Sequence, residues 1–309
     1  MSNLNNTLEY ICEKAKNPSA FVEECEKRYE NIVTDIAKKL ANSGKTEIIM
    51  LAGPSSSGKT TTAKKLREAL SCEGVKSFTV SLDDFYLNNC DAPRFPDGTP
   101  DFETVYALDI ECFEKTMNEI LKTGTGHLPE FDFVLGERKK ELNEIHITEN
   151  DVIIVEGLHA LNPVITQNLP AERLYKIYIN ASSRILDENN NVVLKKREIR
   201  LVRRIVRDYK FRGNSVEKTY GMWKSVCNGE GLYLFPYRNT ADIKINTIFL
   251  YEDCVLKNEA IKLLSEVDEN SQYFGESQML LKNLCRFPSI NKDFVPENSM
   301  LREFIGKKE

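Results

Sequence analysis

Residues 53–60 read GPSSSGKT and have the residue types and spacing of a loop that holds phosphate groups. Gly53 and Gly58 allow backbone angles that a side chain would forbid. The N–H groups of the loop can then converge on phosphate oxygens at the positive end of a following helix. Lys59 would reach the β- and γ-phosphates, and the Thr60 hydroxyl would bind Mg²⁺. The residues expected to contact a nucleoside triphosphate are Gly53, Ser55, Ser56, Ser57, Gly58, Lys59, Thr60 and Thr61.

Acidic residues directly follow two strand-like runs. In doubly wound sheets, ligands bind at the carboxyl ends of the strands, which is where these acids would lie. Asp83 and Asp84 close the first run, and a carboxylate there could accept a proton from an attacking hydroxyl or bind Mg²⁺. Aspartates in such positions also cap helices or form turns. Glu156 follows the apolar run 152–155, which is the Walker-B arrangement with Glu in place of the commoner Asp. His159 comes soon after, and a lone histidine after a strand is more often structural than catalytic.

A basic segment lies further along the chain, at residues 195–212. Arg200, Arg204 and Arg207 share one side at helical spacing, and arginine forks suit phosphate oxygens. A helix of this kind beside the phosphate loop could act as a lid and neutralise charge in the transition state. A solvated basic face or a nucleic-acid surface is the alternative. The net charge of −5 argues against nucleic acid.

The elements that must position these residues alternate between strand and helix patterns. Apolar runs predict strands at 47–52, 77–82, 152–155, 174–180 and 242–245, and helical spacing predicts helices near 58–72, 109–122, 195–210 and 215–226. The alternation predicts an α/β fold with a parallel sheet covered by helices on both faces. We expect a loop at 87–108 and a hairpin turn or disordered insertion at 184–192. Predicted divisions are a helical arm at 1–44, a core at 45–250 with the lid near 195–226, and a helical extension at 251–309.

Composition limits the class of protein. The chain has 309 residues with no apolar run near the roughly 20 residues that span a bilayer. The polar N-terminus lacks a signal-peptide core, and the eight cysteines form no C-x-x-C pair. We therefore expect a cytoplasmic protein with reduced thiols that associates with neither membranes nor nucleic acid.

Together these motifs resemble those of the uridine kinase and phosphoribulokinase family of P-loop kinases. The matching segments are GPSSSGKTTT (53–62), DDFY (83–86), DFE (101–103), ALD (107–109), LPEFDF (128–133), IIVEGLHALNP (153–163) and RRIVRDYKFRG (203–213). The resemblance spans about residues 45–250 and implies a nucleoside-kinase-like P-loop fold. It also implies phosphorylation of a primary hydroxyl by ATP with Mg²⁺, with a nucleoside such as uridine or cytidine as acceptor. Relatives form dimers or tetramers, and the sequence leaves the oligomeric state open.

The resemblance also implies a role for each matching residue. Asp83 falls on the base that takes the proton from the ribose 5′-hydroxyl, and Glu103 on an acid that contacts ribose hydroxyls. Mg²⁺ would be held near Thr60, Asp83 and Glu156. Arginines expected to reach phosphates are Arg204, Arg207 and Arg212. Residues expected at the acceptor are Asp84, Tyr86, Glu103, Phe131 and Arg204.

The acceptor side departs from the pattern of classical uridine-cytidine kinases. Those enzymes place Tyr and His in and after the segment matched by residues 131–136, where this chain has Phe131 and Gly136. Asn214 also stands where they carry another arginine. A kinase of the same fold with a non-nucleoside acceptor, such as a sugar phosphate, therefore remains an alternative. A nucleotide-hydrolysing switch is disfavoured, because the chain has neither a correctly spaced N-K-x-D nor a D-x-x-G motif.

Overall fold

The computed structural model describes residues 5–43, 48–133, 135–148 and 150–308. The expected start of the first strand at Glu47 and the expected end of the arm at residue 44 lie outside the described residues. At the centre of the molecule is a five-stranded sheet in the order β11-β8-β1-β7-β2, in which every pair of neighbours is parallel. Its strands are β1 (Ile48–Ala52), β2 (Ser77–Ser81), β7 (Val152–Gly157), β8 (Leu174–Asn180) and β11 (Ile243–Asn246). All five predicted strands are therefore present.

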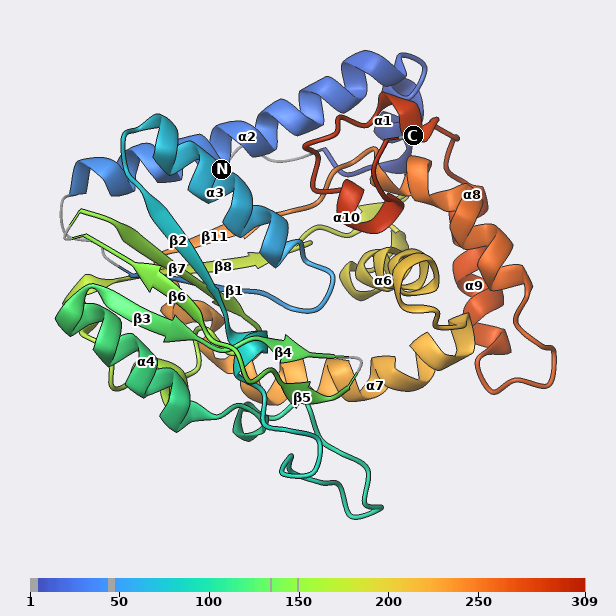
Figure 1. Ribbon diagram of the computed structural model, residues 1–309. Helices are drawn as coiled ribbons and strands as arrows, with labels where there is room; N and C mark the ends of the chain where they lie inside the picture. The colour runs from blue at the N-terminus through green and yellow to red at the C-terminus, as the bar shows by residue number, and fades with distance from the viewer. Residues whose placement is uncertain (1–4, 44–47, 134, 149, 309) are drawn as a thin grey trace.

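Strand β1 shows why both faces of the sheet must be covered. All five of its residues are buried, and its side chains alternate between two separate apolar cores. Ile49 and Leu51 join the core that contains α2 and α3, whereas Met50 joins the core that contains α4. Successive side chains of a strand point to opposite faces, so a continuous apolar run requires helices on both sides. Figure 1 shows this layered arrangement, and the predicted α/β fold is confirmed.

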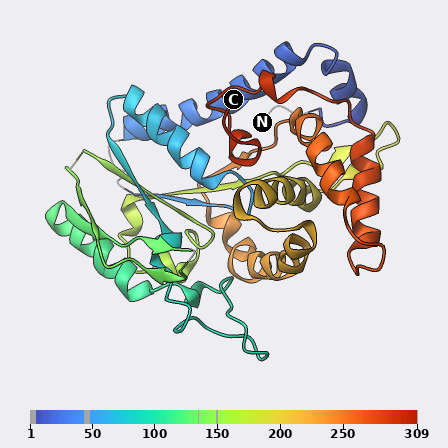
Figure 2. The same ribbon diagram turned by 45° about the vertical axis from the view of Figure 1, so that its right-hand side comes forward.

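Helices surround the sheet in the order the sequence predicted, and the segments expected to be helical at the two ends of the chain also contain helices. The longer helices are α1 (Leu8–Lys14), α2 (Pro18–Ser43), α3 (Lys59–Cys72), α4 (Ile110–Thr123), α6 (Lys196–Arg212), α7 (Val216–Tyr233), α8 (Glu252–Ser265) and α9 (Phe274–Cys285). The short ones are α5 (Pro163–Thr166) and α10 (Arg302–Ile305), with 3₁₀ turns η1 (Leu82–Phe85), η2 (Val105–Ala107), η3 (Ala171–Arg173), η4 (Phe235–Thr240) and η5 (Lys292–Phe294). Helix α2 packs along α3, and α6 contacts α7, α8 and α10 (Figures 1 and 2). Helices near both ends of the chain thus pack into the same apolar core on one face of the sheet.

Short β pairs occur where the sequence pattern was weak. β3 (Thr125–Leu128) pairs with β6 (Asn143–His146), and β4 (Phe131–Asp132) pairs with β5 (Glu137–Arg138). These strands have two to four residues, too few for apolar alternation to reveal them. Residues 184–192 contain the turn of the pair formed by β9 (Ile185–Leu186) and β10 (Val192–Leu194), so the expected hairpin is present. All eight cysteines are free thiols.

Candidate active site

The phosphate loop joins the end of β1 to the start of α3, the order that the motif requires. Gly58 has a φ of 87°, and Ser56 also has a positive φ of 58°. Gly53 is needed for a different reason than the one expected from its sequence. Its φ is not positive, but a Cβ there would lie 2.6 Å from the carbonyl oxygen of Ile179 on β8. The hydroxyls of Ser56 and Ser57 are buried without hydrogen-bond partners among the described residues, so they are available to phosphate oxygens.

Glu156 lies beside the loop because β7 is the neighbour of β1, with Leu51 opposite Glu156 in the register. Its Oε1 accepts hydrogen bonds from Thr60 Oγ1 at 3.2 Å and from Ser81 Oγ at 3.3 Å. Burial raises the pKa of the Glu156 carboxyl to about 7, and the nearby Lys59 acts in the opposite direction. Mg²⁺ is usually held by one or two carboxylates plus substrate phosphates, so the pair of Thr60 and Glu156 fits that ion.

Asp83 lies in η1, directly after β2, and faces the space in front of the loop. The Asp83 side chain is exposed to the open cavity, yet the surrounding protein raises the pKa of its carboxyl, whereas Lys59 and Arg212 lower it. Asp84 points elsewhere, because its Oδ1 accepts a hydrogen bond of 3.3 Å from the backbone N–H of Phe131. The two adjacent aspartates therefore divide their tasks: Asp83 faces the cavity and Asp84 holds strand β4.

Three arginines of α6 face the same space: Arg204, Arg207 and Arg212. The buried carboxylate of Asp208 pairs with all three, at 3.2 Å from Arg204 Nε, 2.8 Å from Arg207 Nη2 and 3.6 Å from Arg212 Nε. Arg204 also donates a 2.7 Å hydrogen bond to the hydroxyl of Ser55. Asp208 thus gathers positive charge opposite the phosphate loop, where a triphosphate would need it.

Two other arginines of α6 hold the loop from behind. Arg200 Nη1 donates to the carbonyl of Ser55 at 2.9 Å, and Arg203 Nη1 donates to the carbonyl of Ser56 at 3.1 Å. Their charges are balanced by Glu230 and Glu252, respectively, in ion pairs of 2.6 Å whose side chains are at most 1% exposed. Sequence spacing grouped Arg200 with the phosphate-binding arginines, but the structure places it outside the cavity lining.

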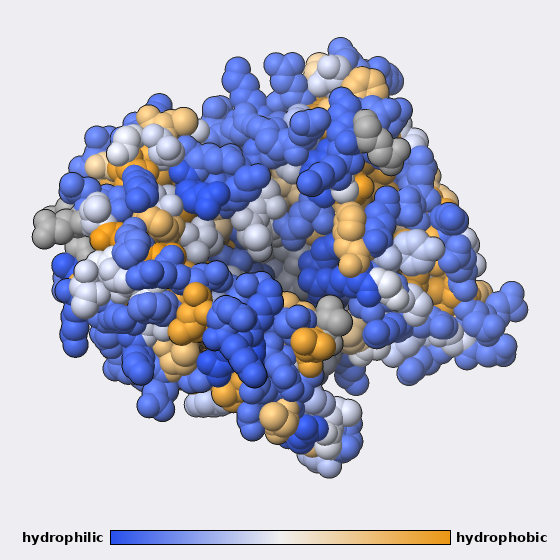
Figure 3. All heavy atoms as spheres, in the orientation of Figure 1, coloured by the Kyte–Doolittle hydropathy of each residue, from blue (hydrophilic) through white to orange (hydrophobic). Residues whose placement is uncertain are grey.

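One cavity of about 750 Å³ unites most of the predicted residues. Figure 3, drawn in the orientation of Figure 1, shows a hollow at the centre of this face of the molecule, with mainly hydrophilic side chains around it. The predicted residues that line the cavity are Ser55, Ser56, Ser57, Gly58, Lys59, Thr60, Asp83, Tyr86, Glu103, Glu156, Arg204, Arg207 and Arg212. Lining residues that the sequence did not single out are Phe133, Leu158, Phe211, Val226 and Glu303. Besides Arg200, four predicted residues lie outside the lining: Gly53, Thr61, Asp84 and Phe131.

The part of the cavity where an acceptor is expected contains Glu103 and a group of aromatic rings. Burial raises the pKa of the Glu103 carboxyl to about 7, and Arg204 opposes that shift. The Tyr86 ring meets Phe131 edge-on at 5.8 Å and Phe133 at 6.4 Å between ring centroids. Phe131 is 7% exposed and supports the other rings, whereas Phe133 is 65% exposed and lines the cavity. Phe133 lies two residues after Phe131 in the same LPEFDF motif, just past the end of β4, and no pattern in the sequence separates it from Phe131.

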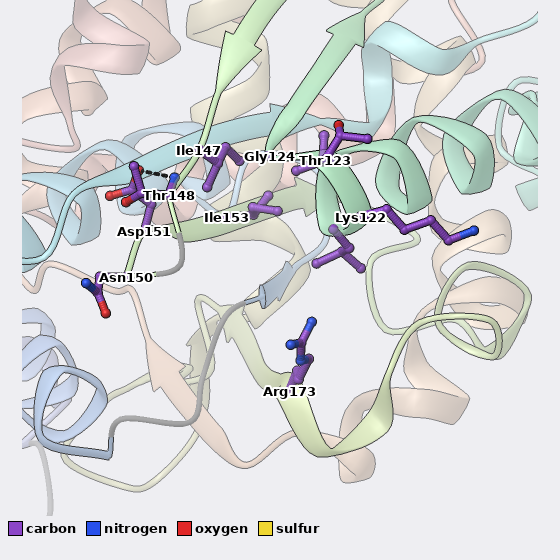
Figure 4. Close-up of a pocket in the computed structure, with 11 residues that line it drawn as sticks. Lys122, Thr123, Gly124, Ile147, Thr148, Asn150, Asp151, Ile153 and Arg173 are labelled. Atoms are coloured by element: carbon purple, nitrogen blue, oxygen red, sulfur yellow. Dashed lines mark hydrogen bonds between the residues drawn. The ribbon is translucent and has the colours of Figure 1, made fainter.

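A second cavity of about 740 Å³ lies at the other end of the sheet (Figure 4). Its lining includes Asp151 and Arg173, which immediately precede β7 and β8. It contains none of the predicted site residues, in agreement with the rule that ligands bind at the carboxyl ends of parallel strands.

His159 is a buried residue that packs inside the protein, away from the cavity. It is 2% exposed, lies outside the cavity lining and packs edge-on against Tyr233 at 5.9 Å between ring centroids. Burial lowers the pKa of its imidazole to about 3.

Neither a preformed metal centre nor a membrane-spanning helix is found among the described residues. Within the described ranges, no group of three or more His, Cys, Asp or Glu residues could hold a metal ion by itself. None of the helices in the same ranges is both long enough and apolar enough to cross a bilayer.

Comparisons with known proteins agree with this geometry. The family model "Phosphoribulokinase / Uridine kinase family" matches residues 48–249. A uridine kinase from Bacillus pumilus is 27% identical over 202 residues, covering 65% of this chain and 86% of that protein. One from Lactobacillus helveticus is 28% identical over 200 residues, covering 64% and 85%. The crystal structure of a candidate fructose transport system kinase from Silicibacter sp. TM1040 superposes with a TM-score of 0.53 at 19% identity, covering 69% of this chain and 98% of that one.

The matched region contains the phosphate loop, Asp83, Glu156 and the arginines of α6, which the structure brings together around one cavity. The chain therefore belongs to the phosphoribulokinase/uridine kinase family and is a P-loop phosphotransferase.

Proposed function

We propose that the protein transfers the γ-phosphoryl group of ATP to a primary hydroxyl of a small molecule, with the 5′-hydroxyl of a nucleoside such as uridine or cytidine as the first candidate. The observation that carries this proposal is the shared cavity, in which Asp83 faces the phosphate loop and the α6 arginines. A protein that only binds the nucleotide would need the phosphate contacts and an acid for Mg²⁺, which Glu156 beside Thr60 can supply, but no second carboxylate facing the phosphates. Phosphoryl transfer to a hydroxyl needs both.

In the proposed reaction the acceptor oxygen bonds to the γ-phosphorus and its proton passes to Asp83, while the bond from that phosphorus to ADP breaks. The raised pKa of Asp83 suits it to accept this proton. Lys59 and the arginines held by Asp208 stabilise the charge on the transferring group. Thr60 and Glu156 would hold Mg²⁺, which when bound neutralises charge on the β- and γ-phosphate oxygens.

The family match and the names of the relatives support a nucleoside as acceptor, but one observation favours the alternative of a non-nucleoside acceptor. Gly136 has a φ of 71°, and a Cβ there would lie 1.9 Å from the side-chain amide nitrogen of Asn89. Gly136 has no side chain that could read a base, and its positive φ disfavours one. Glu103 and Tyr86 would still contact hydroxyls of a sugar.

An acceptor screen tests both candidates. The protein is incubated with ATP, Mg²⁺ and panels of nucleosides and sugar phosphates, and phosphorylated products are identified by mass spectrometry. The Asp83→Asn variant should lose nearly all turnover and still bind ADP. The matched control is Asp84→Asn, whose amide oxygen can still accept from the Phe131 N–H and which should keep most turnover. Unchanged turnover in Asp83→Asn would remove Asp83 as the base, and nucleosides that give no product would favour the second acceptor class.

A further inference from the structure

The C-terminal segment 299–306 packs directly against the phosphate loop. Met300, Leu301 and Phe304 have no exposed surface, and α10 lies beside α6 close to the loop end of α3 (Figure 1). A Cβ on Gly58 would be only 2.0 Å from Met300 Sδ, so the methionine occupies the space that this glycine leaves. The family match ends at residue 249, which makes this segment an addition to the matched core.

Hydrogen bonds fix the segment in place on both sides. Ser299 Oγ bonds the buried carboxylate of Glu26 on α2 at 2.5 Å, and the same carboxylate accepts from Tyr251. The guanidinium of Arg302 donates to the carbonyl of Pro296 just before the segment, at 3.2 Å, and to that of Gly306 at its end, at 3.2 Å. Glu303 follows directly and is therefore held in a defined position.

Glu303 faces the nucleotide cavity. Its Oε2 accepts a 3.0 Å hydrogen bond from Thr61 Oγ1, and the residue lines the cavity with Lys59, Arg207 and Arg212. Within the described residues, no cation lies at ion-pair distance from its carboxylate. The carboxylate therefore retains capacity to accept hydrogen bonds from a ligand.

The position of Glu303 limits which part of a nucleotide it can meet. Consecutive residues of a helix are about 100° apart around its axis, so Thr60 and Thr61 face different sides. Thr60 is bonded to Glu156 at the proposed Mg²⁺ position, and Thr61 is bonded to Glu303. A carboxylate repels phosphate oxygens but accepts from neutral hydroxyls. Beyond its phosphates, a bound nucleotide offers such hydroxyls on its ribose.

On the basis of the proposed donor site, we propose that Glu303 accepts a hydrogen bond from the ribose hydroxyls of the bound nucleotide. The C-terminal segment would then select ribonucleotides over nucleotides that lack these hydroxyls.

The test compares binding of ADP and 2′,3′-dideoxy-ADP, with Mg²⁺ and without acceptor, by isothermal titration calorimetry on the full chain. The wild-type protein should bind ADP about tenfold more tightly, as expected for a hydrogen bond to a charged acceptor. In Glu303→Ala this ratio should fall to about one, through weaker binding of ADP alone. The control Glu297→Ala changes an exposed residue of the same tail and should keep the wild-type ratio.

The isosteric Glu303→Gln variant, whose amide oxygen can still accept from Thr61, should lower the ratio partly and replaces the alanine variant if that does not fold. A ratio that is unchanged in both variants, or a wild-type protein that does not discriminate, overturns the inference. A loss that is equal for both nucleotides also overturns it, because that result indicates a purely structural role. Absence of ADP binding to the wild-type protein would instead refute the proposed donor site itself.

Discussion

Replacing Glu230 by Gln should damage both stability and nucleotide binding, because Glu230 connects α7 to the phosphate loop. Its carboxylate accepts from Arg200 at 2.6 and 2.8 Å and from the backbone N–H of Ser55 at 2.9 Å. Both side chains of the ion pair are at most 1% exposed. The variant leaves the Arg200 charge buried without a counter-charge.

Breaking a buried pair by removing one partner costs about 3–5 kcal/mol. The free energy of unfolding of a typical domain is about 5–15 kcal/mol, so the loss is a large fraction of the total. Urea unfolding followed by circular dichroism measures this change. The matched control is Glu259→Gln, which breaks the partly exposed pair with Lys210 on the same α6, at 3.4 Å. Such pairs contribute roughly 0–1 kcal/mol.

A double replacement separates the two roles of the pair. Arg200→Met with Glu230→Leu removes both buried charges, which is often neutral or stabilising. Stability should therefore recover, but ADP binding should stay weak because the Ser55 carbonyl and N–H have lost their partners. The reasoning is refuted if Glu230→Gln is no more destabilising than Glu259→Gln, or if the double variant binds ADP as the wild type does.

Two further predictions concern charge around the cavity and its support. Asp208→Asn should weaken ADP binding, measured by calorimetry, because the three arginines lose the carboxylate that holds them in position opposite the phosphate loop; unchanged or tighter binding would contradict this role. His159 should make the protein less stable in acid. The imidazole pKa of His159 is about 3 in the folded protein against an ordinary 6.5. Between these two pH values the unfolded chain binds more protons than the folded protein. The free energy of unfolding therefore falls as pH falls through that window. His159→Leu should flatten this dependence in melting curves taken from pH 7 to pH 4 and keep activity at pH 8, whereas loss of that activity would indicate a direct role.

Two pairs of residues that look equivalent in the sequence have different surroundings in the fold. Asp83 and Asp84 are equivalent in the sequence, and both were expected at the site. Only Asp83 faces the cavity, because the 3₁₀ turn η1 points the next side chain toward the N–H of Phe131. Likewise Arg200 and Arg204 share one side of α6 by spacing. Packing against α7 assigns Arg200 to Glu230 and leaves Arg204 in the cavity.

The phosphate loop and the strands of the sheet were predictable from the sequence alone, because each depends on residues that are close together in the chain. The phosphate loop requires its glycines and lysine in one continuous stretch, and apolar runs bounded by helical patterns predicted every strand of the parallel sheet. Residues at the carboxyl ends of those strands must come together, which is why Glu156 was predicted beside Thr60 and is found there.

Contacts between segments distant in the chain were decided by the tertiary structure. Glu303 reaches Thr61 across 242 positions, and Glu230 reaches Ser55 across 175. No periodicity or motif records such pairs, because they depend on how α7, α10 and the loop pack together in three dimensions. The sequence therefore located the candidate site for the phosphates, and the fold determined which buried charges support it and which carboxylate of the tail faces its cavity.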